Sequence, residues 1–151
     1  MVTGAGSGMG LAMATRFTAE GASVVAGDWN GERLDAAVAK IQADGGTIVS
    51  AQGDISDQAT AEGLVDLAVK TYGRLDVLCN NAGVMDYMQG VGELADEIWR
   101  KVLSINLDGP MFASRRGAAH AGARRRRHHQ HCLHGRLARR RGRRRLHRGQ
   151  A

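Results

Sequence analysis

Met1-Val-Thr-Gly-Ala-Gly-Ser-Gly-Met-Gly10 predicts the end of a β-strand, a glycine-rich turn and the start of a helix. Gly4, Gly8 and Gly10 let the backbone turn tightly and approach a diphosphate closely, and the amides at the following helix N-terminus would face that charge. An ordinary glycine-rich turn fits the same ten residues, so the pattern alone leaves both interpretations open. The residues that follow decide between them.

Apolar segments alternate with segments of helical periodicity over residues 1–116. We predict strands ending at Thr3 and over 22–26, 47–51 and 75–79, and helices over about 9–21, 31–43, 58–72, 92–96 and 97–116. The strands are apolar throughout, which is typical of a parallel sheet with helices on both faces. The fold class is therefore α/β, a doubly wound parallel sheet of the Rossmann type. We expect it to be truncated, since only Met1 and Val2 precede Thr3.

Polar residues stand where four successive predicted strands end: Thr3, Asp28, Asp54 and Asn80. Ligands of open parallel sheets bind at this carboxyl edge. Asp28 lies 18 residues after Gly10, where a carboxylate can accept both hydroxyls of an adenosine ribose and would repel a 2′-phosphate. This favours NAD over NADP, although an aspartate in a solvated turn also fits.

Two further segments of this edge fit an adenosine. Asp54 would bond the adenine amine while Ile55 packs on the ring, although Asp54 or Asp57 could equally cap a helix. The small residues after Asn80 form a tight turn that would let the cofactor lie against the sheet, and they fit a plain asparagine-glycine turn as well.

Taken together, the motifs resemble those of the short-chain dehydrogenase/reductase family. The matching residues are Thr3-Gly4-x-x-x-Gly8-x-Gly10, Asp28, Asp54-Ile55, Asn80-Asn81-Ala82-Gly83 and Ser104-Ile105-Asn106-Leu107. The resemblance covers residues 1–116 and implies a Rossmann fold, NAD binding and usually a homo-oligomer. The expected cofactor-binding residues are Gly4, Ser7, Gly8, Met9, Gly10, Asp28, Asp54, Ile55, Asn81, Ala82 and Gly83.

Enzymes of this family transfer a hydride between the nicotinamide and a secondary alcohol or ketone. Their catalytic residues are a serine and a Tyr-x-x-x-Lys set. Neither Tyr72 nor Tyr87 has a lysine four residues later, and no serine follows Ser114. Asn106 is the only catalytic residue retained; its family counterpart holds a water in the proton relay, although a polar residue that kinks a helix would also fit. We therefore expect this chain to be inactive as written.

The charge divides the chain in two. Residues 1–116 hold all 15 acids and nine of the 21 lysines and arginines, a net charge of −6, whereas residues 117–151 hold twelve arginines, no acids and all six histidines. The second part could be a basic arm that binds nucleic acid through its arginines. The donors at His128, His129, His131, Cys132 and His134 suit zinc or nickel, but five donors in seven residues make a poor cage, so we expect no metal site.

The third interpretation, which we favour, is that the tail is read out of frame. Reading the codons from His128 one base later permits Ile-Ile-Asn-Thr-Ala-Ser, which looks like the family's next strand and its serine. Leu146-His147 then permits tyrosine and Gln150-Ala151 permits lysine. The hidden serine and tyrosine lie thirteen positions apart, and the lysine lies four after the tyrosine, which is the family's own spacing. The slip would lie between Phe112 and Arg124.

The remaining expectations are coarse. The chain shows no signal-peptide pattern, no span-length apolar run and only two cysteines, so we expect a cytoplasmic protein without membrane association. The alternative function is a nucleotide-binding remnant whose Arg-rich tail binds nucleic acid. The substrate cannot be predicted, because the loops that set it lie beyond the matched part.

Overall fold

The structure, a computed structural model, describes residues 1–120 of the 151-residue chain. Its elements are β1 (Val2–Thr3), α1 (Gly8–Ala19), β2 (Val24–Asp28), α2 (Gly31–Ala43), β3 (Ile48–Gln52), α3 (Gln58–Tyr72), α4 (Asp96–Leu103), the π-helix η1 (Ser104–Asp108) and α5 (Gly109–His120). The Arg-rich part of the predicted nucleic-acid arm and the candidate metal donors over 128–134 lie outside these described residues, as does the end of the segment between Phe112 and Arg124 in which the reading-frame change is predicted.

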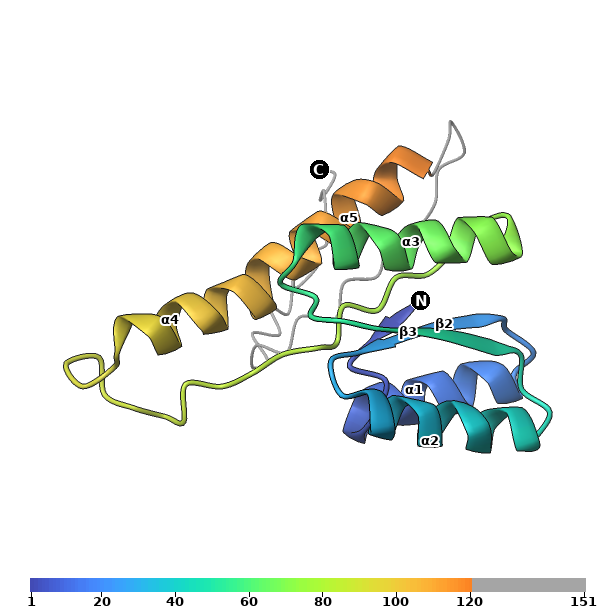
Figure 1. Cartoon of the computed structure of the whole chain (residues 1–151), viewed down its shortest axis with the longest axis horizontal. Coiled ribbons are helices and arrows are strands. Elements are labelled where there is room, and N and C mark those ends of the chain that lie inside the picture. The colour runs from blue at the N-terminus through green and yellow to red at the C-terminus, as the bar shows by residue number, and fades with distance from the viewer. Residues whose placement is uncertain (121–151) are drawn as a thin grey trace, which may run out of the picture.

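A parallel sheet in the order β1-β2-β3 forms the centre of the molecule, which confirms the predicted fold class. Helices α1 and α2 cover one face and α3 and α5 cover the other (Figure 1). Each face has its own apolar cluster: Ala14 and Leu34 pack on one side, and Leu64 and Val65 on the other. β2 is buried along its whole length, as expected for a central strand.

The predicted strand over 75–79 is reduced to one bridge between Val2 and Cys79. Around it, Cys79 N–H donates to Met1 O at 2.9 Å and Thr3 N–H donates to Cys79 O at 3.1 Å. The prediction was wrong in extent because within the described residues this segment pairs only with β1, which is two residues long.

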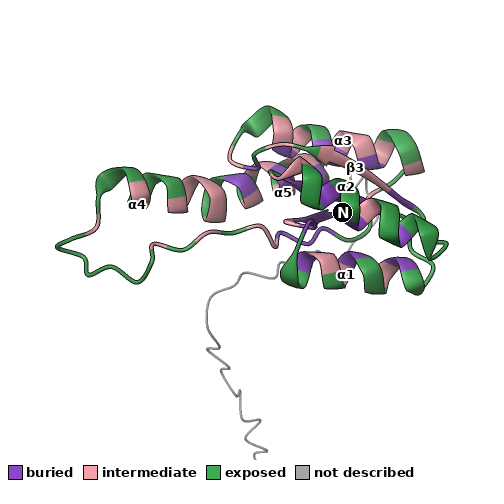
Figure 2. Cartoon of the chain, turned by 60° about the horizontal axis from the view of Figure 1, so that its bottom comes forward, coloured by how far each residue is buried: buried purple, intermediate pink, exposed green. Residues whose placement is uncertain are grey.

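The long helix predicted over 97–116 is divided into α4, η1 and α5. Its first part, α4, has no buried residue and extends away from the sheet with the loop before it (Figure 2). Residues 92–96 do not form the short helix that we predicted, since only turn geometry precedes Asp96. None of the described helices is long and apolar enough to cross a membrane.

Side-chain ion pairs fix α5 on α3. Arg116 Nε and a terminal nitrogen of its guanidinium contact the two oxygens of Asp66 at 2.7 and 2.8 Å, and His120 Nε2 lies 2.9 Å from Asp66 Oδ1. Hydrogen bonding to Arg116 holds the pKa of Asp66 below its ordinary value. The helix thus continues through His120, past the compositional boundary at Arg116.

Arg116→Gln tests this clamp through its pH dependence. Because the Asp66 pKa is lower in the folded than in the unfolded chain, its contribution to stability is fully present above the unfolded value of about 4 and is lost as the pH falls through the folded value. We expect Arg116→Gln to lower the Tm at pH 7 by roughly 1 to 4 °C and to flatten the fall in Tm between pH 5 and 3. Arg100→Gln is the matched control, since Arg100 faces Asp96 at 3.8 Å with both side chains largely exposed. Superimposable pH curves for Arg116→Gln and the unchanged chain would contradict the clamp.

Candidate functional site

The glycine-rich turn at the carboxyl edge of the sheet depends on close backbone contact. Gly4 and Gly8 have φ values of +66° and +53°, which favour glycine. A Cβ at Gly10 would overlap the carbonyl group of Gly4, so the first turn of α1 lies directly on the end of β1. A Cβ at Gly8 would meet nothing within 4 Å, so this part of the turn borders open space.

The amino end of α1 has unused hydrogen-bonding capacity. Ser7 occupies the N-cap position, but its side chain makes no capping hydrogen bond, and the first turn contains no acidic residue. Unpaired amides and the helix dipole at such an end favour an anion. Together with the open space at Gly8, this end of α1 suits a phosphate group. Met9, on the same turn, is 56% exposed.

Thr3 and Asn81 join the glycine-rich turn to the segment over 80–83. The Thr3 hydroxyl oxygen accepts the N–H groups of Asn81 and Ala82, each at 3.0 Å, and Asn81 Nδ2 donates to Thr3 O at 2.9 Å. A Cβ at Gly4 would lie 3.0 Å from Ala82 Cα. Two stretches almost 80 residues apart therefore form one surface, as the sequence predicted for this edge.

Asp28 is buried and ties β2 to the same turn. Its Oδ2 accepts the N–H of Gly6 and its Oδ1 accepts the N–H of Asn30, each at 2.9 Å. A carboxylate oxygen can accept more than one hydrogen bond, so the group retains capacity for hydroxyl donors. The edge thus carries a fixed negative charge between the glycine-rich turn and the start of α2.

At the end of β3, the structure shows which of the two aspartates, Asp54 or Asp57, caps the following helix. Asp57 is the N-cap of α3 and accepts the Thr60 N–H at 2.8 Å, whereas Asp54 accepts the N–H and hydroxyl of Ser56 through Oδ1. Ile55 is only 7% exposed and packs in the core, so it offers little surface to a base. The contact between Ile55 and adenine stays a prediction.

Asn80 and Asn106 hydrogen-bond the segment that leaves the sheet to η1 and α5. Asn80 is buried; its Nδ2 donates to Ser114 Oγ at 3.2 Å, and its Oδ1 has no hydrogen-bond partner among residues 1–120. Asn106 lies in η1 and holds Val84 with both ends of its amide, accepting the N–H at 2.9 Å and donating to the carbonyl at 2.8 Å. A Cβ at Gly83 would lie 3.2 Å from Asn106 Oδ1, so the 83–84 backbone is fixed beside this π-helix.

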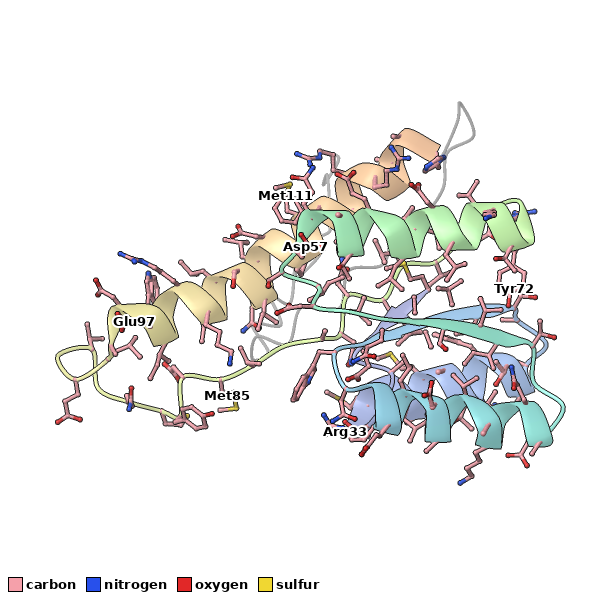
Figure 3. All side chains as sticks on the ribbon, viewed as in Figure 1. Arg33, Asp57, Tyr72, Met85, Glu97 and Met111 are labelled. Atoms are coloured by element: carbon pink, nitrogen blue, oxygen red, sulfur yellow. The ribbon has the colours of Figure 1, made fainter. Side chains whose placement is uncertain are left out.

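Neither tyrosine is placed for chemistry at this edge. The Tyr72 hydroxyl donates to the carbonyl of Val24 at 3.4 Å, at the amino end of β2, and burial raises the Tyr72 pKa. Figure 3 shows Tyr72 at the opposite end of α3 from Asp57 and far from Arg33. Tyr87 is 81% exposed in the loop before α4. Within residues 1–120, no group of three or more His, Cys, Asp or Glu side chains could hold a metal.

Sequence reasoning placed Thr3 at this edge but did not predict that its hydroxyl joins two segments. It missed one exposed residue of the edge. Trp29, directly after Asp28, is 68% exposed and was not considered. The available signal was an aromatic residue next to a predicted site in a chain with only 4% aromatic residues.

Comparison with known proteins matches most of the chain to one family. The family model described as short chain dehydrogenase matches residues 1–126. The 3beta-hydroxysteroid dehydrogenase 2 of Eggerthella lenta is 35% identical over 116 residues, which are 77% of this chain and 45% of that protein. The meso-2,3-butanediol dehydrogenase of Serratia marcescens is 39% identical over 121 residues, covering 80% of this chain and 47% of that protein.

A solved structure of a metagenomic short-chain oxidoreductase in complex with NADP superimposes with a TM-score of 0.73 at 32% identity, covering 78% of this chain and 53% of that one. The chain thus spans about half the length of these similar proteins.

Gly10→Ala tests the backbone contact on which the edge is built. Its methyl group would overlap the Gly4 carbonyl, so we expect a loss of about 1–3 kcal/mol or more in the free energy of unfolding. Gly63→Ala, in the interior of α3 with open space around its Cβ, is the control and should stabilise the chain by about 0.5–1 kcal/mol. Urea denaturation measures both, and a Gly10→Ala variant as stable as Gly63→Ala would contradict the proposed packing.

Proposed function

Since the chain belongs to the short-chain dehydrogenase family, we propose that residues 1–116 bind the adenosine diphosphate half of NAD and that the 151-residue chain does not transfer hydride. The observation that carries the proposal is the contact of the Gly4–Gly10 turn with Asn81 and Ala82 beside a buried Asp28. This arrangement leaves an uncapped helix end and a carboxylate on one edge.

Each part of the cofactor has a matching group. The diphosphate would lie at Ser7, Gly8 and Met9, against the open space and the amides of α1. Asp28 would accept the ribose hydroxyls, and Asp54 would accept the adenine amine. The chain from Asn81 to Gly83 would form the floor beneath the adenosine. When bound, NAD supplies the hydride acceptor, while these residues only hold and orient it.

We propose NAD rather than NADP because Asp28 places a buried negative charge where a 2′-phosphate would lie. The similar metagenomic enzyme was solved with NADP, so family membership alone does not decide the cofactor.

Neither tyrosine of the described residues is placed to act as the general acid of the family reaction. Tyr72 is bonded at the amino end of the sheet, and Tyr87 lies exposed in the loop. Asn106 is proposed as the retained relay residue, but its side-chain amide is engaged by Val84. We therefore expect the described residues to bind the cofactor of the family reaction on a secondary alcohol or ketone without supplying its proton donor.

We also propose that the Arg-rich segment is an out-of-frame translation of the family's catalytic half. This accounts for its composition without a nucleic-acid function, and the family match that continues to residue 126 is compatible with a slip between Phe112 and Arg124. Self-association through α4, η1 and α5 is the proposed oligomeric contact, because Trp99, Leu107 and Met111 are exposed there.

Calorimetry with NAD and NADP tests the cofactor site through Asp28→Asn, which keeps the shape and removes the charge. We expect NAD to bind about tenfold or more weakly, because charge-assisted hydrogen bonds to the ribose are lost, while NADP binding stays equal or improves. Asp35→Asn, an exposed acid on α2, makes the same change in net charge and is the control. Equal NAD affinity in Asp28→Asn and Asp35→Asn would contradict the proposed role of Asp28.

Resequencing the gene between the codons for Phe112 and Arg124 tests the reading-frame proposal. We expect one base to be missing or extra, and a frame-restored protein to reduce NAD with secondary alcohols such as 2,3-butanediol or a 3β-hydroxysteroid. The 151-residue chain should show no alcohol-dependent NADH formation under the same assay. An unchanged gene sequence would make the frameshift a real mutation rather than a sequencing error. A shifted reading of the gene that lacks the serine and the Tyr-x-x-x-Lys set would overturn the reading-frame proposal, and NADH formation by the 151-residue chain would overturn the proposed inactivity.

A further inference from the structure

A cavity of about 300 Å³ lies at the amino end of the sheet, opposite the edge that carries the proposed cofactor site. Phe17 of α1 lines it from one face of the sheet, and Ala68 and Tyr72 of α3 line it from the other. Val24 at the start of β2 and Val77 of the 75–79 segment form its side walls. Protein interiors are close-packed and leave few apolar voids of this size, so the cavity calls for an apolar occupant.

β1 does not reach along this cavity. It pairs with two of the five residues of β2, Ala26 and Gly27, whereas β3 pairs with all five. The first two residues of β2, Val24 and Val25, extend past β1 and line the cavity. The cavity therefore lies on the line along which a longer first strand would run between β2 and the 75–79 segment.

The backbone of Met1 holds the position of a residue inside a strand. Its nitrogen donates to Val77 O at 2.9 Å, and its carbonyl accepts the N–H of Cys79 at 2.9 Å. Met1 is only 8% exposed, and burial lowers the pKa of its ammonium group. These surroundings disfavour a charge, whereas a peptide nitrogen would make the same hydrogen bond to Val77 without one.

Val25 presents a buried amide on the β1 side of β2. Val24 N–H donates to Thr47 O at 2.9 Å on the β3 side, and successive amides of a strand alternate in direction, so Val25 N–H points the other way. Val25 is 1% exposed, and a buried amide needs an acceptor. In the observed register, the residue before Met1 would lie opposite Val24, and its carbonyl would accept this N–H.

We propose that the cavity is the binding site of an extended apolar segment, at least two residues long, that continues β1 ahead of Met1 in the same chain. Side chains alternate along a strand, and Met1 packs in the cluster beneath α3 and α5 while Val2 packs in the one beneath α1 and α2. The residue directly before Met1 therefore faces Phe17, and the one before that faces Ala68 and Tyr72. The two apolar sides of the cavity fit two apolar side chains in this alternation. The inference does not depend on the dinucleotide site.

Extension of the 151-residue chain by Val-Ile directly before Met1, behind a new initiator methionine, tests the site. We expect the Tm to rise by roughly 10 °C, because two apolar side chains become buried. Extension by Gly-Ser in the same place is the matched control. It adds the same length of backbone without apolar side chains, so it should raise the Tm far less.

Ala68→Leu separates filling of the cavity from a general effect on stability. In the 151-residue chain the larger side chain enters the cavity, so we expect the Tm to rise by roughly 2 to 4 °C. In the chain extended by Val-Ile the space is occupied, so the same substitution should lower the Tm. Ala61→Leu is the control, since Ala61 lies in the packed core of the same helix, is 0% exposed and does not line the cavity. It should lower the Tm of both chains, and an Ala68→Leu effect of the same sign in both chains would contradict the proposal.

Mass spectrometry of the protein produced from the gene with its own upstream region identifies the source of the segment. We expect an N-terminus ahead of Met1, and an N-terminus at Met1 overturns the same-chain assignment. If acetyl-Val-Ile-amide in solution then raises the Tm of the 151-residue chain, the cavity takes a segment of another molecule instead. Equal Tm values for the Val-Ile and Gly-Ser extensions overturn the site altogether. If the 151-residue chain gives no cooperative transition, the position of the N-terminus decides.

Discussion

The contact between Gly10 and the Gly4 carbonyl is the constraint on which the site depends. No side chain fits between these two backbones, so the first turn of α1 lies against the end of β1. The amides of the helix end are consequently presented at the carboxyl edge of the sheet rather than behind it. Asn81 then bonds to the same strand end, so the position of the 80–83 segment follows from the position of the turn.

The two faces of the sheet contribute differently to this edge. The cluster beneath α1 and α2 holds the glycine-rich turn and the Asp28 turn, which contact the nucleoside in our proposal. The cluster beneath α3 and α5 supports Ile55 and, through η1, the Val84 backbone. A π-helix inserts one residue into the helical ladder and is frequent at functional sites. Here it turns the Asn106 amide toward the segment that leaves the sheet.

The sequence predicted best what local chemistry determines. The predicted helices over 31–43 and 58–72 coincide with α2 and α3, because Asn30 and Asp57 cap their first turns and Gly73 ends α3 with a φ of +74°. The strand over 75–79 depends on a distant partner, so its apolar pattern could not report how little of it would pair. Nor does helical periodicity distinguish a π-helix from a continuous α-helix. The exposure of Trp29 follows from how the turn after β2 lies against Gln52, which is again a non-local contact.

The positions of the tyrosines show that this fold can place cofactor-binding groups at one edge of the sheet without placing a proton donor there. The carboxyl edge collects groups from the ends of several strands, and a proton donor must come from that same edge to reach a bound substrate. Tyr72 hydrogen-bonds at the amino end of β2, and no small movement of a side chain brings it across the sheet. The proposed contacts hold the adenosine half of the cofactor, which does not react. The binding energy of these contacts lowers the barrier to hydride transfer only when other residues contact the reacting atoms and orient them. In our proposal the only such residue within 1–120 is Asn106, whose amide is occupied by Val84, so we expect the described part to bind a cofactor without directing its reaction.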